Sequence, residues 1–442
     1  MKYVSTRNSN IKYSFEEIFF KGLADDGGLF IPENFYKLSK DEILKFSKLS
    51  FQEISEFIFS KYTGETFKKD ELNQIINNAY KNFRCQKIVD VKKYKNINLV
   101  QLFHGPTLAF KDIAMQVLGQ MYNNLLIKNK KKINIITATS GDTGAAAINA
   151  FKDNEKINIF VLHPNNKISD VQRKLMTTTA SKNVFNIAIN GNFDDCQNLV
   201  KAMFTDKTFA NEIKMSGVNS INWARIIAQS VYYFYSYFLV DDNSEPINFS
   251  VPTGNFGDVY AGYLAKKIGL PINKFVVATN QNDILHRAIT NGAYNVENVL
   301  ETISPSMDIQ IASNFERLIF DLNNHSDKKT IDVMKGIKEK GKYEIQKESL
   351  DKINVDFLSS RMDENEVLNT IKTVYEKFDK VLDPHSAIGY GAFDKVNLKG
   401  NNIVLATAHP CKFPDAIEKA INIKAELPSE LAFILDEKEN YD

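Results

Sequence analysis

A lysine near the start of a predicted helix is the residue of this sequence best suited to covalent chemistry. Lys111 lies in the segment HGPTLAFKD at 104–112, after an apolar run at 98–102 and before an apolar helical stretch. The positive end of the helix and the apolar residues at 108–110 both disfavour an ammonium ion, so they lower the pKa of the amine. Lys111 is therefore a candidate amine nucleophile, and the alternative is a solvated lysine at a helix start.

A glycine loop at 137–147, TATSGDTGAAA, joins a predicted strand to a predicted helix and could bind an anion. Its glycines let the backbone approach a ligand closely, and the hydroxyl groups of Ser140 and Thr143 add donors. No lysine follows in the register of a P-loop. The alternative is a capped tight turn with Asp142 at the N-cap.

A second glycine loop, VPTGNFGD at 251–258, has the same order of strand, loop and helix. Gly254 and Gly257 bracket Asn255 and Phe256, and no basic residue lies within the loop. Backbone amides at a helix start can bind one phosphate dianion without a basic side chain. The spacing is not GxGxxG, so a dinucleotide site is not indicated, and an ordinary turn is the alternative.

A hydroxyl group follows the last predicted strand, in the segment LATAHPCKFP at 405–414. Thr407 could hydrogen-bond a heterocycle nitrogen, whereas His409, like His104, could be a packed histidine satisfied by the backbone. The sequence has no HExxH motif and no CxxC spacing, so we predict no metal site. It also has no GxSxG elbow, which argues against a serine hydrolase.

The elements that must position these residues follow an α/β pattern. Short apolar, β-branched runs alternate with longer helical segments, which predicts mainly parallel open sheets covered by helices, with ligands at the carboxyl ends of the strands. The predicted strands are 98–102, 133–139, 157–162, 184–189, 247–251, 274–279 and 402–407. We predict a small, mainly helical N-terminal domain at 1–90, a first lobe with Lys111 at 91–240 and a second lobe with the 251–258 loop at 241–442.

Composition restricts the partners. The 442 residues include 55 Lys and Arg against 54 Asp and Glu, a net charge of +1, so no global field favours nucleic acid or an anionic membrane. The three cysteines lie far apart, and no apolar run reaches the ~18 residues that a membrane helix needs. The N-terminus lacks an apolar leader, and we therefore expect a cytoplasmic protein.

Taken together, these signals select one class of chemistry. A candidate amine nucleophile, a phosphate loop without basic residues, a second anion loop and a lone hydroxyl group are the parts needed to hold pyridoxal phosphate and a carboxylate substrate. The sequence therefore favours an enzyme that depends on pyridoxal phosphate.

Several ordered blocks then make the chain resemble the threonine synthase family, in its longer subclass with an N-terminal domain of its own. The blocks are KYVSTR at 2–7, LADDGGLFIP at 23–32, HGPTLAFKD at 104–112, TSGDTG at 139–144, SINWAR at 220–225, TGNFGD at 253–258, SMDI at 306–309, DPHSA at 383–387 and TAHP at 407–410. The similarity runs almost from end to end.

The resemblance implies fold type II of the pyridoxal-phosphate enzymes, which is like the tryptophan synthase β subunit, and the last step of threonine biosynthesis. In that step O-phospho-L-homoserine and water give L-threonine and phosphate. Carried over by motif, Lys111 is the Schiff-base lysine and Thr407 lies near the pyridine nitrogen. The loop for the cofactor phosphate is Gly254, Asn255, Phe256 and Gly257, with Asp258 closing the motif.

By the same similarity, the substrate carboxylate would be held by Ser140, Gly141, Asp142 and Thr143. Asn222 and Arg225 are candidates for the substrate phosphate, although Arg225 could equally be a structural ion-pair residue. We expect a monomer or homodimer with a small-molecule substrate. The alternatives are another fold type II enzyme, such as a serine or threonine dehydratase, and a non-catalytic relative that binds a phosphorylated ligand.

Overall fold

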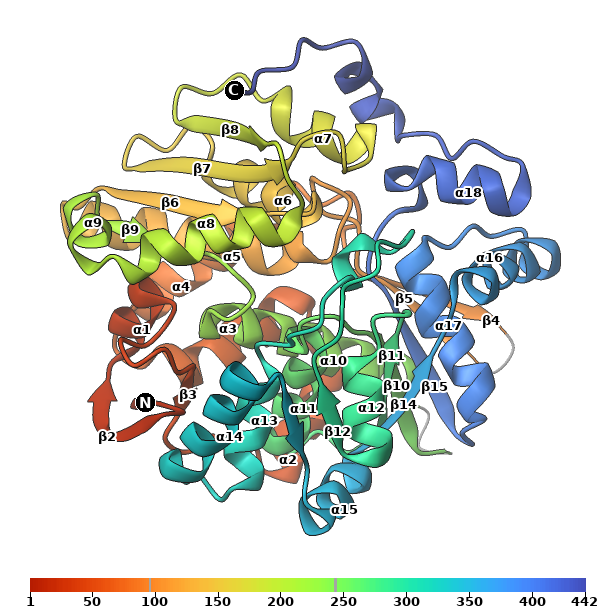
Figure 1. Ribbon diagram of the computed structural model, residues 1–442, viewed down its shortest axis with the longest axis horizontal. Helices are drawn as coiled ribbons and strands as arrows, with labels where there is room; N and C mark the ends of the chain where they lie inside the picture. Colours follow the sequence, from red (N-terminus) through yellow and green to blue (C-terminus); the bar gives the residue numbers. More distant parts are fainter. Residues whose placement is uncertain (95–96, 242–244) are drawn as a thin grey trace.

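The computed structural model describes residues 1–94, 97–241 and 245–442, and it forms two open sheets that lie next to an N-terminal domain (Figure 1). The larger sheet has six strands in the order β14-β11-β10-β15-β5-β4, of which all pairs are parallel except β4 with β5. Its strands are β4 (Asp90–Tyr94), β5 (Ile97–Gln101), β10 (Ile247–Pro252), β11 (Ile272–Thr279), β14 (Phe357–Arg361) and β15 (Asn401–Ala406).

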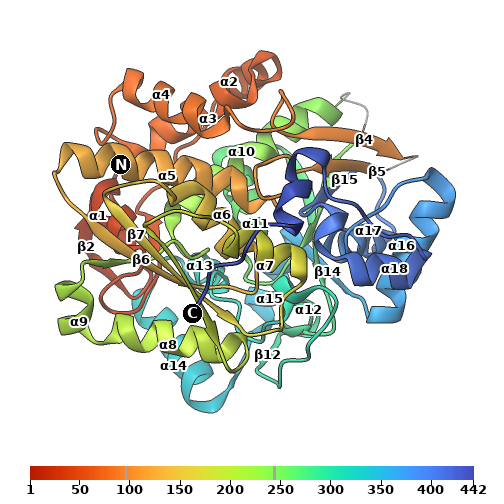
Figure 2. The same ribbon diagram turned by 90° about the horizontal axis from the view of Figure 1, so that it is seen from above.

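The smaller sheet is parallel throughout and has the order β8-β7-β6-β9. Helix α8 covers one of its faces, and α5 and α6 lie on the other side (Figure 2). The strands are β6 (Ile133–Ala138), β7 (Ile157–Pro164), β8 (Val184–Ile189) and β9 (Met215–Ser216). The helices of this part are α5 (Lys111–Lys128), α6 (Asp142–Phe151), α7 (Asp170–Thr177), α8 (Phe193–Thr205) and α9 (Lys207–Glu212).

These sheets confirm the predicted α/β class, and all seven predicted strands are present within two residues of their expected ends. Their distribution differs from the contiguous lobes expected at 91–240 and 241–442. Strand β5 pairs in parallel with β15, with Leu99 opposite Val404, so the strand before Lys111 belongs to the larger sheet. Residues 242–244, just after the boundary expected between 240 and 241, lie outside the described residues.

The N-terminal domain is mainly helical, as expected, and adds a three-stranded antiparallel sheet in the order β2-β1-β3. Its first helix begins with a capping box in which the Ser14 hydroxyl accepts from the Glu17 amide and the Glu17 carboxylate accepts from the Ser14 amide. The elements are β1 (Tyr3–Ser5), β2 (Asn8–Tyr13), α1 (Phe15–Lys21), β3 (Phe30–Pro32), α2 (Lys40–Lys45), η1 (Phe46–Lys48), α3 (Phe51–Thr63) and α4 (Lys69–Tyr80).

The remaining elements surround the larger sheet, where α17 packs on β10, β11, β14 and β15. The helices are α10 (Trp223–Val240), α11 (Gly257–Ile268), α12 (Ile284–Asn291), α13 (Phe315–Leu322), α14 (Asp327–Lys340), α15 (Lys347–Asp356), α16 (Glu364–Phe378), α17 (Pro384–Val396) and α18 (Pro414–Ile421). The short elements are β12 (Ala293–Asn295), η2 (Pro305–Met307), β13 (Lys342–Glu344), η3 (Pro410–Lys412) and η4 (Ser429–Leu435). In the described part of the chain, no helix is long and apolar enough to cross a membrane.

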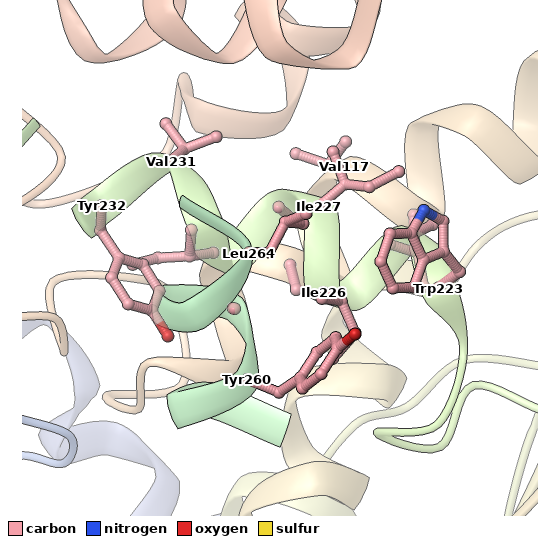
Figure 3. Packing of buried hydrophobic residues seen from close by; sticks show 14 of the residues in the cluster. Val117, Trp223, Ile226, Ile227, Val231, Tyr232, Tyr260 and Leu264 are labelled. Atoms are coloured by element: carbon pink, nitrogen blue, oxygen red, sulfur yellow. The ribbon is translucent and has the colours of Figure 1, made fainter. Parts of the chain in front are cut away.

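Helices α10 and α11 pack against each other in the core (Figure 3). Ile226, Ile227 and Trp223 of α10 are fully buried there with Tyr260 and Leu264 of α11. Because α10 is apolar on most of its surface, it can be enclosed by neighbouring elements on nearly every side.

Gly262 allows this close approach. A Cβ atom at this position would lie 2.6 Å from Tyr233 and 2.7 Å from Phe275. Gly336, a helical glycine in α14, has only one atom within 4 Å of the same position, at 3.9 Å. The two glycines therefore offer a matched comparison of packing and helix propensity.

We expect Gly262→Ala to lower the free energy of unfolding by about 1–3 kcal/mol, because overpacking outweighs the gain in helix propensity. Gly336→Ala is expected to raise it by about 0.5–1 kcal/mol, since the added methyl group meets no obstacle. Thermal unfolding midpoints, compared with that of the unchanged protein, show whether Gly262→Ala is less stable and Gly336→Ala more stable. Equal midpoints would contradict the packing argument.

Candidate active site

The carboxyl ends of strands from both sheets bring the predicted chemical residues together. Ala109 and Ala408 form an isolated antiparallel bridge, and the Phe110 amide donates to the Thr407 carbonyl oxygen at 2.8 Å. Lys111 therefore begins α5 directly beside the segment that follows β15. The loop after β6 approaches the same amine from the smaller sheet, because Asp142 lies 3.4 Å from Lys111 Nζ.

The Lys111 side chain is buried, with 11% of its surface exposed, and its amine contacts two oxygen atoms. Lys111 Nζ donates to Ser306 Oγ at 3.1 Å as well as to Asp142 Oδ2. Burial lowers the pKa of the amine, the Asp142 carboxylate opposes this shift, and the charges of Lys412 and Arg225 add to it. The net shift is downward, so the structure favours the buried amine nucleophile over the solvated lysine.

A second buried lysine holds Asp142 from the opposite side. Lys412 is fully buried and donates to Asp142 Oδ1 at 2.7 Å and to the Thr107 carbonyl oxygen at 2.8 Å. Gln172 donates to the same carboxylate oxygen at 2.9 Å. Burial alone would raise the pKa of Asp142, but Lys412 and Lys111 more than reverse this effect, and the carboxylate stays ionised.

The Asp142 side chain is not suited to binding a substrate carboxylate. An ionised side chain that already accepts from three groups would repel a second carboxylate. Ser140 and Thr143 are half-buried, and neither hydroxyl has a hydrogen bond within the described residues. The Gly141 and Gly144 amides already donate to Thr139 Oγ1, at 2.9 Å and 2.8 Å. The remaining donors are the Asp142 and Thr143 amides at the start of α6 and these two hydroxyl groups, with Gly141 in a positive-φ conformation at the turn.

The loop at 254–257 presents its backbone at the start of α11. A Cβ atom on Gly254 would lie 2.8 Å from the Ser306 carbonyl oxygen, and one on Gly257 would lie 3.1 Å from Asn314. Phe256 between them adopts a left-handed conformation with φ of 63° and is fully buried. The Asn255 amide is engaged with Ser220, so the loop offers main-chain donors to an anion rather than side chains.

Asp258, which closes the loop motif, has its carboxylate directed at α10. Its Oδ1 atom accepts from Tyr232 at 2.5 Å and from Tyr233 at 2.8 Å. Burial raises the pKa of Asp258 to about 6, against the two tyrosine hydrogen bonds, which lower it. These contacts give the side chain a role in joining α10 to α11 behind the loop.

Thr407 is held through its backbone, which leaves its hydroxyl available. The Thr407 amide donates to Ser386 Oγ at 3.1 Å, and Thr407 Oγ1 has no hydrogen bond in the described ranges. Asp383 accepts from both Ser386 and His385, and His385 Nε2 in turn accepts from the Ser306 amide at 3.3 Å. The block DPHSA thus holds both Thr407 and the serine that contacts Lys111.

The two candidates for the substrate phosphate have different surroundings. Asn222 is the N-cap of α10, where its oxygen accepts from the Ala224 amide at 3.0 Å and its amide donates to the Phe19 carbonyl at 3.1 Å. Arg225 is buried, and within the part of the chain that the structure describes its side chain donates to the Val218 carbonyl oxygen and leaves Nε without a partner. Burial lowers the pKa of Arg225 to about 10, so it remains charged at neutral pH.

Arg225 therefore lacks the structural ion pair that the sequence left open. Within residues 1–94, 97–241 and 245–442, no carboxylate lies within ion-pair distance of it. Its charge nevertheless acts on Lys111, which places it close to the site. A buried guanidinium without a partner is suited to an anionic ligand.

Sequence reasoning assigned no role to four residues that contact the site: Ser306, Lys412, Gln172 and His385. It placed Lys412 at the same strand edge as Thr407 but did not predict its contact with Asp142. Ser306 and His385 lie in blocks that carried the family resemblance, and Lys412 lies five residues after Thr407. Their roles depend on partners distant in the chain: Lys111 and Ser306, for example, are separated by 195 positions in the sequence. Gln172 had no motif around it that could have indicated its contact.

These features fit pyridoxal phosphate. The site joins a buried amine of lowered pKa, a backbone loop whose glycines leave no room for a Cβ atom, and an unpartnered hydroxyl beside the lysine. None of the described residues forms a cluster of three or more histidine, cysteine, aspartate or glutamate side chains suited to a metal ion.

Comparisons with known proteins agree with this class of site. Residues 89–407 match the family model described as "Pyridoxal-phosphate dependent enzyme". Residues 2–80 match "Threonine synthase N terminus", and residues 386–442 match "Threonine synthase, C-terminal".

Individual relatives are similar over nearly the whole chain. The threonine synthase of Pseudomonas aeruginosa is 40% identical over 99% of this chain and 94% of its own length, and that of Saccharomyces cerevisiae is 40% identical over 95% and 89%. The crystal structure of PLP-bound threonine synthase from Brucella melitensis superposes with a TM-score of 0.96 at 42% identity, covering 100% of this chain and 96% of that one.

The fold and the site define an enzyme that depends on pyridoxal phosphate and has the fold of the type II class. The matches at both ends of the chain narrow this class further. The chain belongs to the threonine synthase family, and it is a pyridoxal-phosphate-dependent lyase with threonine synthase function.

Asp142→Asn tests the electrostatic balance around the amine. Because the Asp142 carboxylate is the group that raises the pKa of Lys111, its neutral replacement is expected to lower that pKa further, so that the amine reacts at lower pH. Competitive acetylation of the apoprotein across a pH series, followed by peptide mass spectrometry, measures the midpoint at Lys111. Asp25→Asn, at an exposed ion pair with Lys21, should leave the midpoint unchanged, and a higher midpoint in Asp142→Asn would contradict the argument.

Proposed function

We propose that this enzyme converts O-phospho-L-homoserine and water into L-threonine and phosphate, as the last step of threonine biosynthesis. The observation that carries the proposal is the buried Lys111 amine between Asp142 and Ser306, beside Thr407 and the 254–257 loop. The family match supports the same reaction. Support for the individual residue roles comes from geometry and charge.

Each part of the site has a role in this proposal. When bound, pyridoxal phosphate would withdraw electrons from the substrate carbons next to its amino group. Lys111 anchors the cofactor covalently and, once released as a neutral amine, removes the Cα proton and holds it for return. The amides of Gly254–Gly257 would bind the cofactor phosphate, and the Thr407 hydroxyl would be the hydrogen-bonding partner of the pyridine nitrogen.

Substrate binding divides between two anion sites. The amides at the start of α6, with Ser140 and Thr143, hold the substrate carboxylate. Arg225 holds the substrate phosphate, because it is a buried cation with an unpartnered Nε atom close enough to Lys111 to act on its pKa. Asn222 positions Arg225 by capping α10 three residues earlier rather than by binding substrate.

Two further expectations belong to this proposal. Cytoplasmic location is supported by three free cysteines, Cys85, Cys196 and Cys411, none of which pairs with another. We also keep the expectation of a monomer or homodimer.

Lys111→Ala is the direct test of function. Phosphate release from O-phospho-L-homoserine is expected to fall by at least about 1,000-fold, together with the visible absorbance of the covalently held cofactor, because one amine is both anchor and base. Lys128→Ala, at the exposed end of the same helix, is the matched control. Keto acid release from serine or threonine without phosphate release would favour a dehydratase instead, and substrate binding without turnover would favour a non-catalytic relative.

Arg225→Met tests the substrate phosphate site. The KM for O-phospho-L-homoserine is expected to rise by about 30-fold or more, because losing one partner of a buried charge pair costs about 2–5 kcal/mol. The free protein should be no less stable, since the substitution removes a buried charge that has no ion-pair partner. Steady-state kinetics and thermal unfolding give the two readings, and a stability loss with unchanged KM would assign Arg225 to structure.

A further inference from the structure

The N-terminal block KYVSTR has no role in the chemistry described so far, yet it makes buried polar contacts with α13. Arg7 forms a two-pronged ion pair with Glu316, with Nε to Oε1 at 2.9 Å and Nη2 to Oε2 at 2.7 Å. Thr6 Oγ1 donates to the same carboxylate at 2.6 Å while accepting from the Leu29 amide. Figure 1 shows the N-terminal strands beside α13 and α14, so this block fixes α13 against the N-terminal domain.

The next residue on α13 carries the contact further inward. Arg317 is fully buried and donates from Nε to the Phe30 carbonyl oxygen of β3 at 3.0 Å. Its Nη2 atom donates to the Ile221 carbonyl oxygen at 2.6 Å, and its Nη1 atom donates to Asn314 Oδ1. The guanidinium also lies over the Trp223 ring, 5.3 Å from its centre.

Asn314 connects this arginine to the glycine loop. The Asn314 amide nitrogen of the main chain donates to the Asn255 carbonyl oxygen at 3.2 Å, and its side chain donates to the Ser220 carbonyl oxygen at 3.3 Å. A Cβ atom on Gly257 would lie 3.1 Å from Asn314 Nδ2, so the two residues are in direct contact. The rigid planar fork of Arg317 therefore fixes the orientation of Asn314, and Asn314 packs against the loop.

We propose that Arg317 is a positioning residue that couples the N-terminal domain to the Gly254–Gly257 loop and aligns the loop amides before an anion binds. The inference rests on the proposed role of this loop in holding the cofactor phosphate. A site built from backbone donors has no charged side chain to compensate for poor alignment, so its affinity depends on how well the amides are fixed in advance. The N-terminal domain then serves the cofactor site without touching the cofactor.

Arg317→Lys tests this role in the full-length apoprotein. Lysine keeps the charge but lacks the fork that reaches three acceptors, so the Kd for pyridoxal phosphate, from absorbance titration, should rise by about 10–100-fold. Hydrogen exchange at residues 253–258 of the apoprotein should become faster. Arg287→Lys is the matched control, because Arg287 also donates from all three nitrogen atoms, to Asp283, Asn295 and Gln310, and none of these lies in the loop.

Two more variants separate the possible outcomes. Asn314→Ala breaks the link next to the loop and should weaken pyridoxal phosphate in the same range, with Arg317 still bound to Phe30 and Ile221. Gly254→Ala places a methyl group against Ser306 and tests the loop itself. If Gly254→Ala weakens pyridoxal phosphate while Arg317→Lys changes neither its Kd nor the exchange, the coupling is refuted and the loop assignment stands. If Gly254→Ala has no effect either, the loop assignment fails, and the coupling fails with it.

Discussion

The contact between the Lys111 amine and the Asp142 carboxylate sets the conditions for the rest of the site. Burial removes the amine from water and favours its neutral form, whereas an adjacent carboxylate favours the charged form. Lys412 shifts this balance towards the neutral amine, because it pairs with Asp142 Oδ1 at 2.7 Å and its own charge lowers the pKa of Lys111. The amine is thus held in place by a carboxylate that raises its pKa, while burial and the neighbouring cations outweigh that effect.

The two anion sites proposed for this protein use different physical means. The loop after β10 presents backbone amides at a helix start, and its glycines leave no room for a side chain. Arg225 is a buried cation that lacks an ion-pair partner within the described residues, which makes it costly in the free protein and strong once an anion arrives. The cofactor and the substrate would therefore be bound differently. Fixed backbone amides would hold the phosphate of the cofactor, whereas the phosphate of the substrate would neutralise the buried charge of Arg225 when it binds.

Local sequence was sufficient for the parts of the fold that follow from local physics. The seven predicted strands are apolar, β-branched runs long enough to be read by pattern, whereas β9 has two residues and β14 contains two consecutive serines. Lys111 and the glycine loops were found because each lies where a strand meets a helix. Lys412 could not be found in this way, since nothing near it in the chain reveals that it is buried against Asp142. For Asp258 the motif gave the position, but the pair of tyrosines that engages its side chain comes from another helix.

Strand β5 belongs to the sheet that also carries the 254–257 loop and the Thr407 segment, whereas the Asp142 loop extends from the smaller sheet. Lys111 therefore lies where the two parts meet: the residues before it follow β5 of the larger sheet, and helix α5, which it begins, packs on α6 over the smaller sheet. The position of its amine thus depends on both sheets at once, and a shift of either sheet would be felt at this one residue.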